Sequence, residues 1–171
     1  GVDYYNEKLD STGLFFDETG MPVTERDNTG YFVQNQMSSG RHQLILALRQ
    51  DDHEGYGKND TGSISYGYQL TDNLQVVGSY GSAFKAPTFN DLYWPAGMWT
   101  GGNPNLLPEQ SENYEIGFKG SHYNVDWSLN LFDNQIEDLI EWAQVPGTWY
   151  YEPRNVDKSH IKGAEVELVT Y

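Results

Sequence analysis

The fold is decided by a stretch in which every second side chain is apolar, Ser63-Ile64-Ser65-Tyr66-Gly67-Tyr68-Gln69-Leu70. Successive side chains of a β-strand point to opposite faces of the sheet, so the isoleucine, the two tyrosines and the leucine share one face. The other face carries only small or polar groups. The stretch is therefore predicted to be a strand with one apolar and one polar face.

The same alternation recurs elsewhere along the chain. Five further stretches follow it: residues 43–49, 74–80, 114–119, 125–131 and 164–168. One more strand is expected near residues 2–8 and another near residues 28–37, and the last two strands are expected to be long hairpin arms around residues 144–148. We therefore expect about eight antiparallel strands.

The connections between these strands alternate between short and long. Tight turns are predicted at residues 38–40, 71–73 and 120–122, and longer loops at residues 10–26, 51–60, 84–110 and 144–148. A sheet with short turns on one rim and long loops on the other is typical of an outer-membrane β-barrel, whose short rim is periplasmic. The loop lengths therefore predict an antiparallel transmembrane β-barrel.

The composition of the 171 residues agrees with this class. Aromatic residues make up 15% of the chain, yet only 37% of it is hydrophobic, and no stretch approaches the roughly 20 consecutive apolar residues of a membrane-spanning helix. The net charge of -15 argues against nucleic acid as a partner, because phosphate binding requires Lys and Arg. With no cysteine, the chain can form neither disulfides nor thiolate metal sites.

Two other architectures fit the alternation. One is a complete barrel of about eight strands, whose interior side chains can fill. The other is a soluble two-sheet sandwich that binds carbohydrate through its Trp and Tyr side chains. The alternating loop lengths and the Ser, Gly, Gln and Glu of the polar faces favour the transmembrane barrel over the sandwich.

Several spaced motifs resemble those of TonB-dependent outer-membrane receptors. They are residues 79–87, Leu92-Tyr93, residues 102–109 with Ser111 and Glu115, residues 131–140, Asn155-Val156-Asp157 and residues 161–165. Within that family the chain is most similar to the vitamin B12 (cobalamin) receptors, on the spacing of residues 28–30, 49–52 and the Tyr80 segment and on Tyr150-Tyr151 before Asn155. Siderophore and haem receptors share most of these motifs and stay as alternatives.

The resemblance implies a function and a setting. Residues 1–171 are expected to be a single segment of a barrel of about 22 strands, without the plug domain. The implied role is TonB-energised uptake of cobalamin or an iron chelate across the Gram-negative outer membrane. TonB would act through the absent plug, and outer-membrane lipid and lipopolysaccharide would surround the barrel. No enzyme activity and no cofactor are expected.

Ligand contacts are predicted in the longest loop, residues 84–110. The candidates are Asn90, Tyr93, Trp94, Met98 and Trp99, which lie among Pro and Gly residues. Exposed aromatic side chains on a loop give contact area at small entropic cost, although such residues also pack loops onto a barrel rim. No metal site is predicted, because the acidic residues of the 51–60 loop lack the spacing of a calcium-binding hand.

Overall fold

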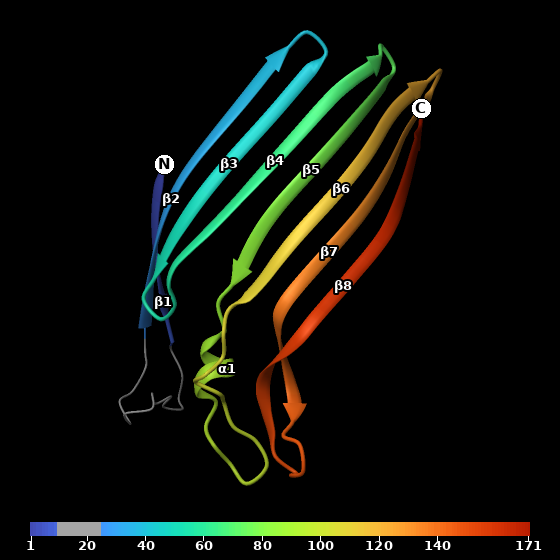
Figure 1. Ribbon diagram of the computed structural model, residues 1–171. Helices are drawn as coiled ribbons and strands as arrows, with labels where there is room; N and C mark the ends of the chain where they lie inside the picture. The colour runs from blue at the N-terminus through green and yellow to red at the C-terminus, as the bar shows by residue number, and fades with distance from the viewer. Residues whose placement is uncertain (10–24) are drawn as a thin grey trace.

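The computed structural model describes residues 1–9 and 25–171, and these form one antiparallel sheet of eight strands in chain order (Figure 1). The strands are β1 (Val2–Lys8), β2 (Glu25–Ser39), β3 (His42–His53), β4 (Gly57–Thr71), β5 (Leu74–Lys85), β6 (Glu109–His122), β7 (Val125–Gln144) and β8 (Tyr151–Thr170). A short helix, α1 (Phe89–Tyr93), lies between β5 and β6. In the described ranges, no helix has the length and apolar character needed to cross a membrane.

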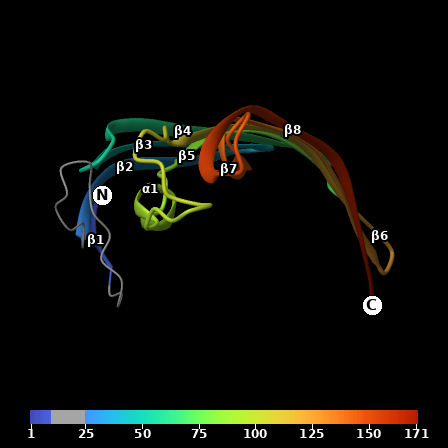
Figure 2. The same cartoon turned by 90° about the horizontal axis from the view of Figure 1, so that it is seen from below.

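The sheet curves into an open arc (Figure 2). Strands β1 and β8 are its two edges, and over the described residues they do not pair with each other. Both alternative architectures are therefore wrong for this part of the chain. The arc is not closed into a barrel of eight strands, and the strands form one sheet instead of the two packed sheets of a sandwich.

The strand register separates a polar concave face from an apolar convex face. Residues directly opposite each other in an antiparallel pair share a face, and β3 pairs with β4 through Leu46–Ile64 and Ile45–Ser65. Arg26 of β2 donates a hydrogen bond to the Pro87 carbonyl, in the loop that lies on the concave side (Figure 2). Counting along the register from Arg26 places Ser65 on the concave face and Ile64 on the convex face.

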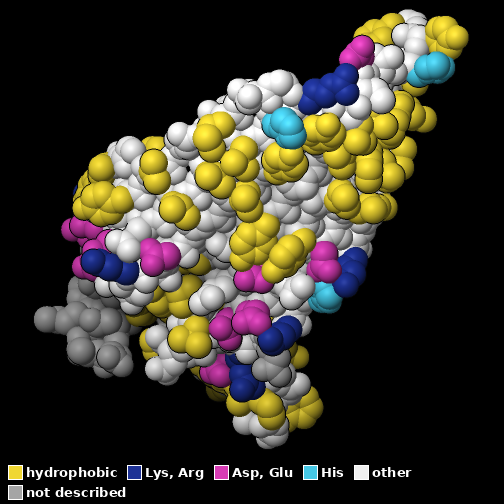
Figure 3. Space-filling model, turned by 45° about the horizontal axis from the view of Figure 1, so that its top comes forward, with side chains coloured by type: hydrophobic (Ala, Val, Ile, Leu, Met, Phe, Trp, Pro, Cys, Tyr) yellow, Lys and Arg dark blue, Asp and Glu magenta, His cyan; other side chains and the backbone are white. Residues whose placement is uncertain are grey.

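The convex face has two zones. Figure 3 shows a broad band of hydrophobic side chains, with acidic and basic side chains gathered toward the end that carries the long loops. The band includes the alternating apolar residues predicted from the sequence, for example Leu46 and Ile64, whose side chains are exposed. A soluble protein rarely exposes an apolar surface of this kind, whereas lipid-facing strands require one.

The short-turn rim is more regular than predicted. Each turn has two residues between paired strands: Gly40-Arg41, Asp72-Asn73 and Tyr123-Asn124. The turn predicted at residues 120–122 was placed too early, because Gly120, Ser121 and His122 still pair with Trp127, Asp126 and Val125. Tyr123 closes that hairpin with a positive φ of 52°.

The long-loop rim also differs from the prediction. The loop predicted at residues 51–60 contains only Glu54 to Tyr56, because β3 and β4 continue to pair as far as His53 and Gly57. A positive φ of 66° at Gly57 reverses the chain there. The loop predicted at residues 10–26 lies outside the described residues except for Glu25 and Arg26, which belong to β2.

Candidate functional site

The loop from Ala86 to Pro108 folds into the concave side of the sheet (Figure 2). Its helix α1 begins with a capping box, in which the Thr88 side chain accepts from the Asp91 amide and the Asp91 side chain accepts from the Thr88 amide. Leu92 and Leu106 are buried, at 6% and 3% exposure. The loop therefore has a small core of its own, which gives its exposed side chains fixed positions.

The five predicted ligand residues lie on two sides of this loop. Trp94 packs edge-on against Trp142 of β7, with ring centroids 6.4 Å apart. Met98 and Trp99 follow in the exposed part of the loop, at 81% and 60% exposure. Tyr93 instead lines a cavity beside β2 and β3. The structure thus separates Tyr93 from the tryptophans, which lie toward the β7–β8 hairpin.

Asn90 is the fifth predicted residue, and it is an exposed member of α1. Its backbone carbonyl accepts from the Trp94 amide at 3.2 Å, the hydrogen bond that ends the helix. Its backbone thus helps to fix the position of Trp94.

The β7–β8 hairpin pairs directly with the loop. The Tyr151 amide donates to the Trp99 carbonyl at 2.8 Å, and the Gly101 amide donates to the Tyr151 carbonyl at 3.2 Å. Thr100 and Tyr151 form a parallel β-bridge. A Cβ atom on Gly101 would lie 2.1 Å from the Tyr150 hydroxyl oxygen, so glycine permits this close approach.

This pairing creates a surface that the sequence analysis missed. Aromatic side chains from both segments lie at the joined loops, and we call this set the aromatic platform: Trp94, Trp99, Trp142, Trp149 and Tyr151. All five are exposed by 43% or more, with Trp149 at 78%. The signal was present in the sequence as a second aromatic-rich segment, residues 142–151, but only the fold brings the two segments together.

The other side of the loop is attached to β2. The Arg26 guanidinium lies 4.5 Å from the centre of the Phe89 ring, donates to the Pro87 carbonyl at 2.7 Å and forms an ion pair with Glu7. Cation–π and charge-assisted contacts of this kind are strong when they are partly buried. The loop is therefore held at both ends, by β2 at one side and by β8 at the other.

A cavity of about 240 Å³ lies between the Ala86–Pro108 loop and the ends of β2 and β3. It is lined by Arg26, His53, Tyr56, Phe89 and Tyr93, together with five neighbours. Burial lowers the pKa of His53, and burial raises the pKa of Tyr56 to about 12. Both side chains are thus neutral near pH 7. The contact between the loop and β2 therefore resembles a packed interface more than a catalytic site.

A network of polar side chains covers the adjoining concave wall. Arg49 donates to Asp51 at 2.6 Å and to Asp3 at 2.8 Å, and Asn28 donates to Asp51 at 2.7 Å. Neighbouring Asp52 alternates to the convex face. The acidic residues considered for a metal site therefore point in opposite directions, and the described residues contain no group of three or more potential ligands.

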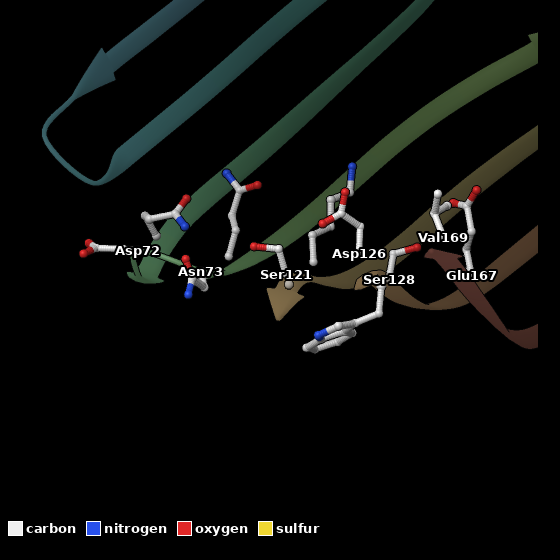
Figure 4. Close-up of a pocket in the computed structure, with 12 residues that line it drawn as sticks. Asp72, Asn73, Ser121, Asp126, Ser128, Glu167 and Val169 are labelled. Atoms are coloured by element: carbon white, nitrogen blue, oxygen red, sulfur yellow. The ribbon is translucent and has the colours of Figure 1, made fainter. Parts of the chain in front are cut away.

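A shallow hollow of about 390 Å³ lies on the concave face near the short-turn rim (Figure 4). Most of the residues that line it are polar, and they come from strands β4 to β8 and the turn between β4 and β5, including Gln75, Lys119, Ser128 and Glu167. These residues belong to the polar rows predicted from the alternation. The polar face of the sheet therefore lies on the inside of the arc.

Comparison with known proteins supports one family. The model of the "TonB dependent receptor-like, beta-barrel" family matches residues 1–171. A vitamin B12 transporter of Photobacterium profundum is 39% identical over 97% of the chain, and one of Vibrio vulnificus is 36% identical over 99% of it. The chain spans only 26% and 27% of the lengths of these two relatives.

Solved structures share the fold. A mutant ferric enterobactin receptor of Pseudomonas aeruginosa, in complex with enterobactin, matches with a TM-score of 0.80 at 23% identity, covering 96% of this chain and 29% of that one. The siderophore receptor PirA of Acinetobacter baumannii matches with a TM-score of 0.74 at 21% identity, covering 98% and 31%. At these identities the likeness concerns the arrangement of the strands.

Proposed function

The chain belongs to the TonB-dependent receptor β-barrel family, and from this premise we propose that it forms wall and loops of an outer-membrane importer of vitamin B12. The observation that carries the proposal is the 39% identity to a vitamin B12 transporter across almost the whole chain. The siderophore receptors are less than 25% identical and support the fold alone. Uptake of an iron chelate is the second candidate function.

The architecture suits this role. The convex band would face lipid, and the concave polar rows would face a wet interior. We propose that residues 1–171 are one segment of a longer barrel, that a plug domain lies elsewhere in the full protein, and that TonB acts on that plug. The relatives are receptors and transporters, and we propose no catalytic activity.

The charged convex zone fits the outer headgroup region. On β8 the convex row changes from Ala164, Val166 and Leu168 to Lys162, His160 and Lys158 toward the long-loop rim. Asp133 lies 3.0 Å from the Lys162 ammonium, and Glu137 lies 2.5 Å from the Lys158 ammonium. Charged side chains on the lipid face destabilise a barrel when they lie within hydrocarbon. We therefore place this zone among lipid and lipopolysaccharide headgroups.

The proposed ligand site is the aromatic platform. Cobalamin is a bulky ligand, and exposed tryptophans on rigid supports offer a large contact area. Binding energy at such surfaces concentrates in a few aromatic anchors. The candidates Trp94, Met98 and Trp99 would therefore act together with Trp142, Trp149 and Tyr151.

Replacing Trp94 and Trp99 together by Ala in the full-length receptor is expected to weaken cobalamin binding by about 1 to 3 kcal/mol. The measurement is equilibrium binding to purified receptor in detergent. The matched control is Trp127→Ala, because Trp127 lies on the convex face near the short-turn rim, where its ring packs over Gly120. This control should bind cobalamin normally.

Two results would change the assignment. A double variant that binds cobalamin normally but no longer binds a ferric chelate would indicate that the ligand of this site is a siderophore. A double variant whose barrel loses its heat resistance would show that both tryptophans pack the loop onto the barrel instead of binding ligand.

The rim assignment predicts which sites are reachable from outside the cell. Cysteines introduced at Gly55 and Gly97, on the long-loop rim, should react with an impermeant maleimide on intact cells. A cysteine at Ser39, beside a two-residue turn on the opposite rim, should react only after the cells are broken. Labelling of the Ser39 variant on intact cells would reverse the proposed orientation.

A further inference from the structure

Asn155 of β8 binds the end of the Ala86–Pro108 loop as another strand would. Its side-chain oxygen accepts from the Leu107 amide at 2.9 Å, and its side-chain nitrogen donates to the Leu107 carbonyl at 2.9 Å. One primary amide thus satisfies both backbone groups of one residue. Ser and Asp cannot do this, because neither supplies a donor and an acceptor in this planar arrangement.

The same nitrogen also donates to the Asp138 carbonyl at 2.7 Å. Asp138 has a positive φ of 54°, although the β7–β8 register is the same on both sides of it, at Glu137–Lys158 and at Leu139–Val156. A left-handed backbone is unfavourable for a residue other than glycine unless its surroundings hold it there. Asn155 therefore connects the loop to a residue of β7 that has a left-handed backbone conformation.

A buried carboxylate completes this attachment. One oxygen of Glu109, whose side chain is 11% exposed, accepts from the Ile140 amide at 3.2 Å and from the Lys85 ammonium at 3.0 Å. Asn103 also donates to the Pro153 carbonyl at 3.0 Å. The loop is thereby joined to one short stretch of β7 and β8 at several points.

The Asn155 contact and the aromatic platform share strand β8. Asn155 is four residues from Tyr151, whose backbone pairs with Trp99 and Gly101. If the loop end is free to move, the tryptophans of the two segments lose their fixed spacing. A ligand must then order them on binding, which lowers affinity without removing any contact.

We propose that Asn155 is a positioning residue for the ligand, which holds the two loop segments of the platform in their binding arrangement. This inference rests on the proposed function, because it concerns the same site. Asn155 itself touches no ligand in this mechanism. It acts through Leu107 and Asp138.

The test compares Asn155→Ala with Asn124→Ala in the full-length receptor. Asn124 is a matched control, because it also donates a side-chain hydrogen bond to a backbone carbonyl, that of Tyr171, but at the opposite rim. Asn155→Ala should weaken cobalamin affinity roughly tenfold, about the effect of one or two net hydrogen bonds. Asn124→Ala should leave it unchanged, and neither should alter barrel heat resistance.

A readout without ligand separates this inference from the proposed function. Spin labels at Gly97 and Pro146, one on each segment, should give a narrow distance distribution in the parent receptor and a broad one in Asn155→Ala. An equally narrow distribution in Asn155→Ala would overturn the role of Asn155. A parent receptor that binds no cobalamin would instead contradict the proposed function.

A covalent replacement provides the rescue. These 171 residues contain no cysteine, so Leu107→Cys and Asn155→Cys introduce one thiol pair among them, at the contact that it replaces. The oxidised double variant should regain most of the parent affinity, and reduction should lower it to that of Asn155→Ala. Equal weak binding in both states would show that the loss does not come from a free loop end.

Discussion

Leu46→Arg in the full-length receptor is expected to lower the free energy of unfolding by about 2 to 4 kcal/mol, the cost of a charged side chain on the lipid face near mid-membrane. Leu46 lies in the middle of β3, opposite Ile64 on β4 and Asn35 on β2. Its side chain belongs to the convex apolar band. An arginine there must reach the headgroups along the strand or draw water into the hydrocarbon.

Ser65→Arg is the matched control for this change. Ser65 lies on the neighbouring strand opposite Ile45, on the concave face, where a charged side chain remains in water. It should cost much less than Leu46→Arg. Urea titration of receptor folded into lipid vesicles measures both, and equal costs would contradict the assigned facing.

The sequence was sufficient to predict which side chains share a face of each strand. Period-2 alternation depends only on backbone geometry and on the contrast between an apolar and a polar face, so the rows around Leu46 and Ile64 were identified correctly. The rim boundaries were harder. Asp51 and Asp52 look like loop residues, yet they pair with Asn59 and Lys58, because backbone pairing does not depend on the polarity of the side chains.

Only part of the candidate site could be predicted from the sequence. Trp94 and Trp99 stood out because their loop is long, but their partners Trp142 and Tyr151 lie more than 40 positions further along the chain. Nothing local reveals that the Asn155 amide will bind Leu107. The contact depends on the β7–β8 register and on the folding of the loop into the concave side, and both are long-range properties.

The 171-residue chain by itself is expected neither to insert into lipid as a monomer nor to transport anything. Its sheet ends at β1 and β8, which do not pair with each other over the described residues. β8 spans Tyr151–Thr170 and pairs with β7 along one side, so its other side presents backbone N–H and C=O groups. Each such group costs several kcal/mol in hydrocarbon when it is unsatisfied.

An ordered form of this chain must therefore pair its edges with another copy or fold the sheet onto itself. Refolding it into lipid vesicles, beside the full-length receptor as control, tests the expectation by flotation, by heat-dependent mobility on gels and by ion conductance. The full-length receptor should float with the vesicles and show a heat-dependent shift in mobility. A detergent-solubilised monomer of the 171 residues that conducts ions or takes up cobalamin would mean that β1 and β8 can meet, and that this sheet closes into a small barrel when lipid is present.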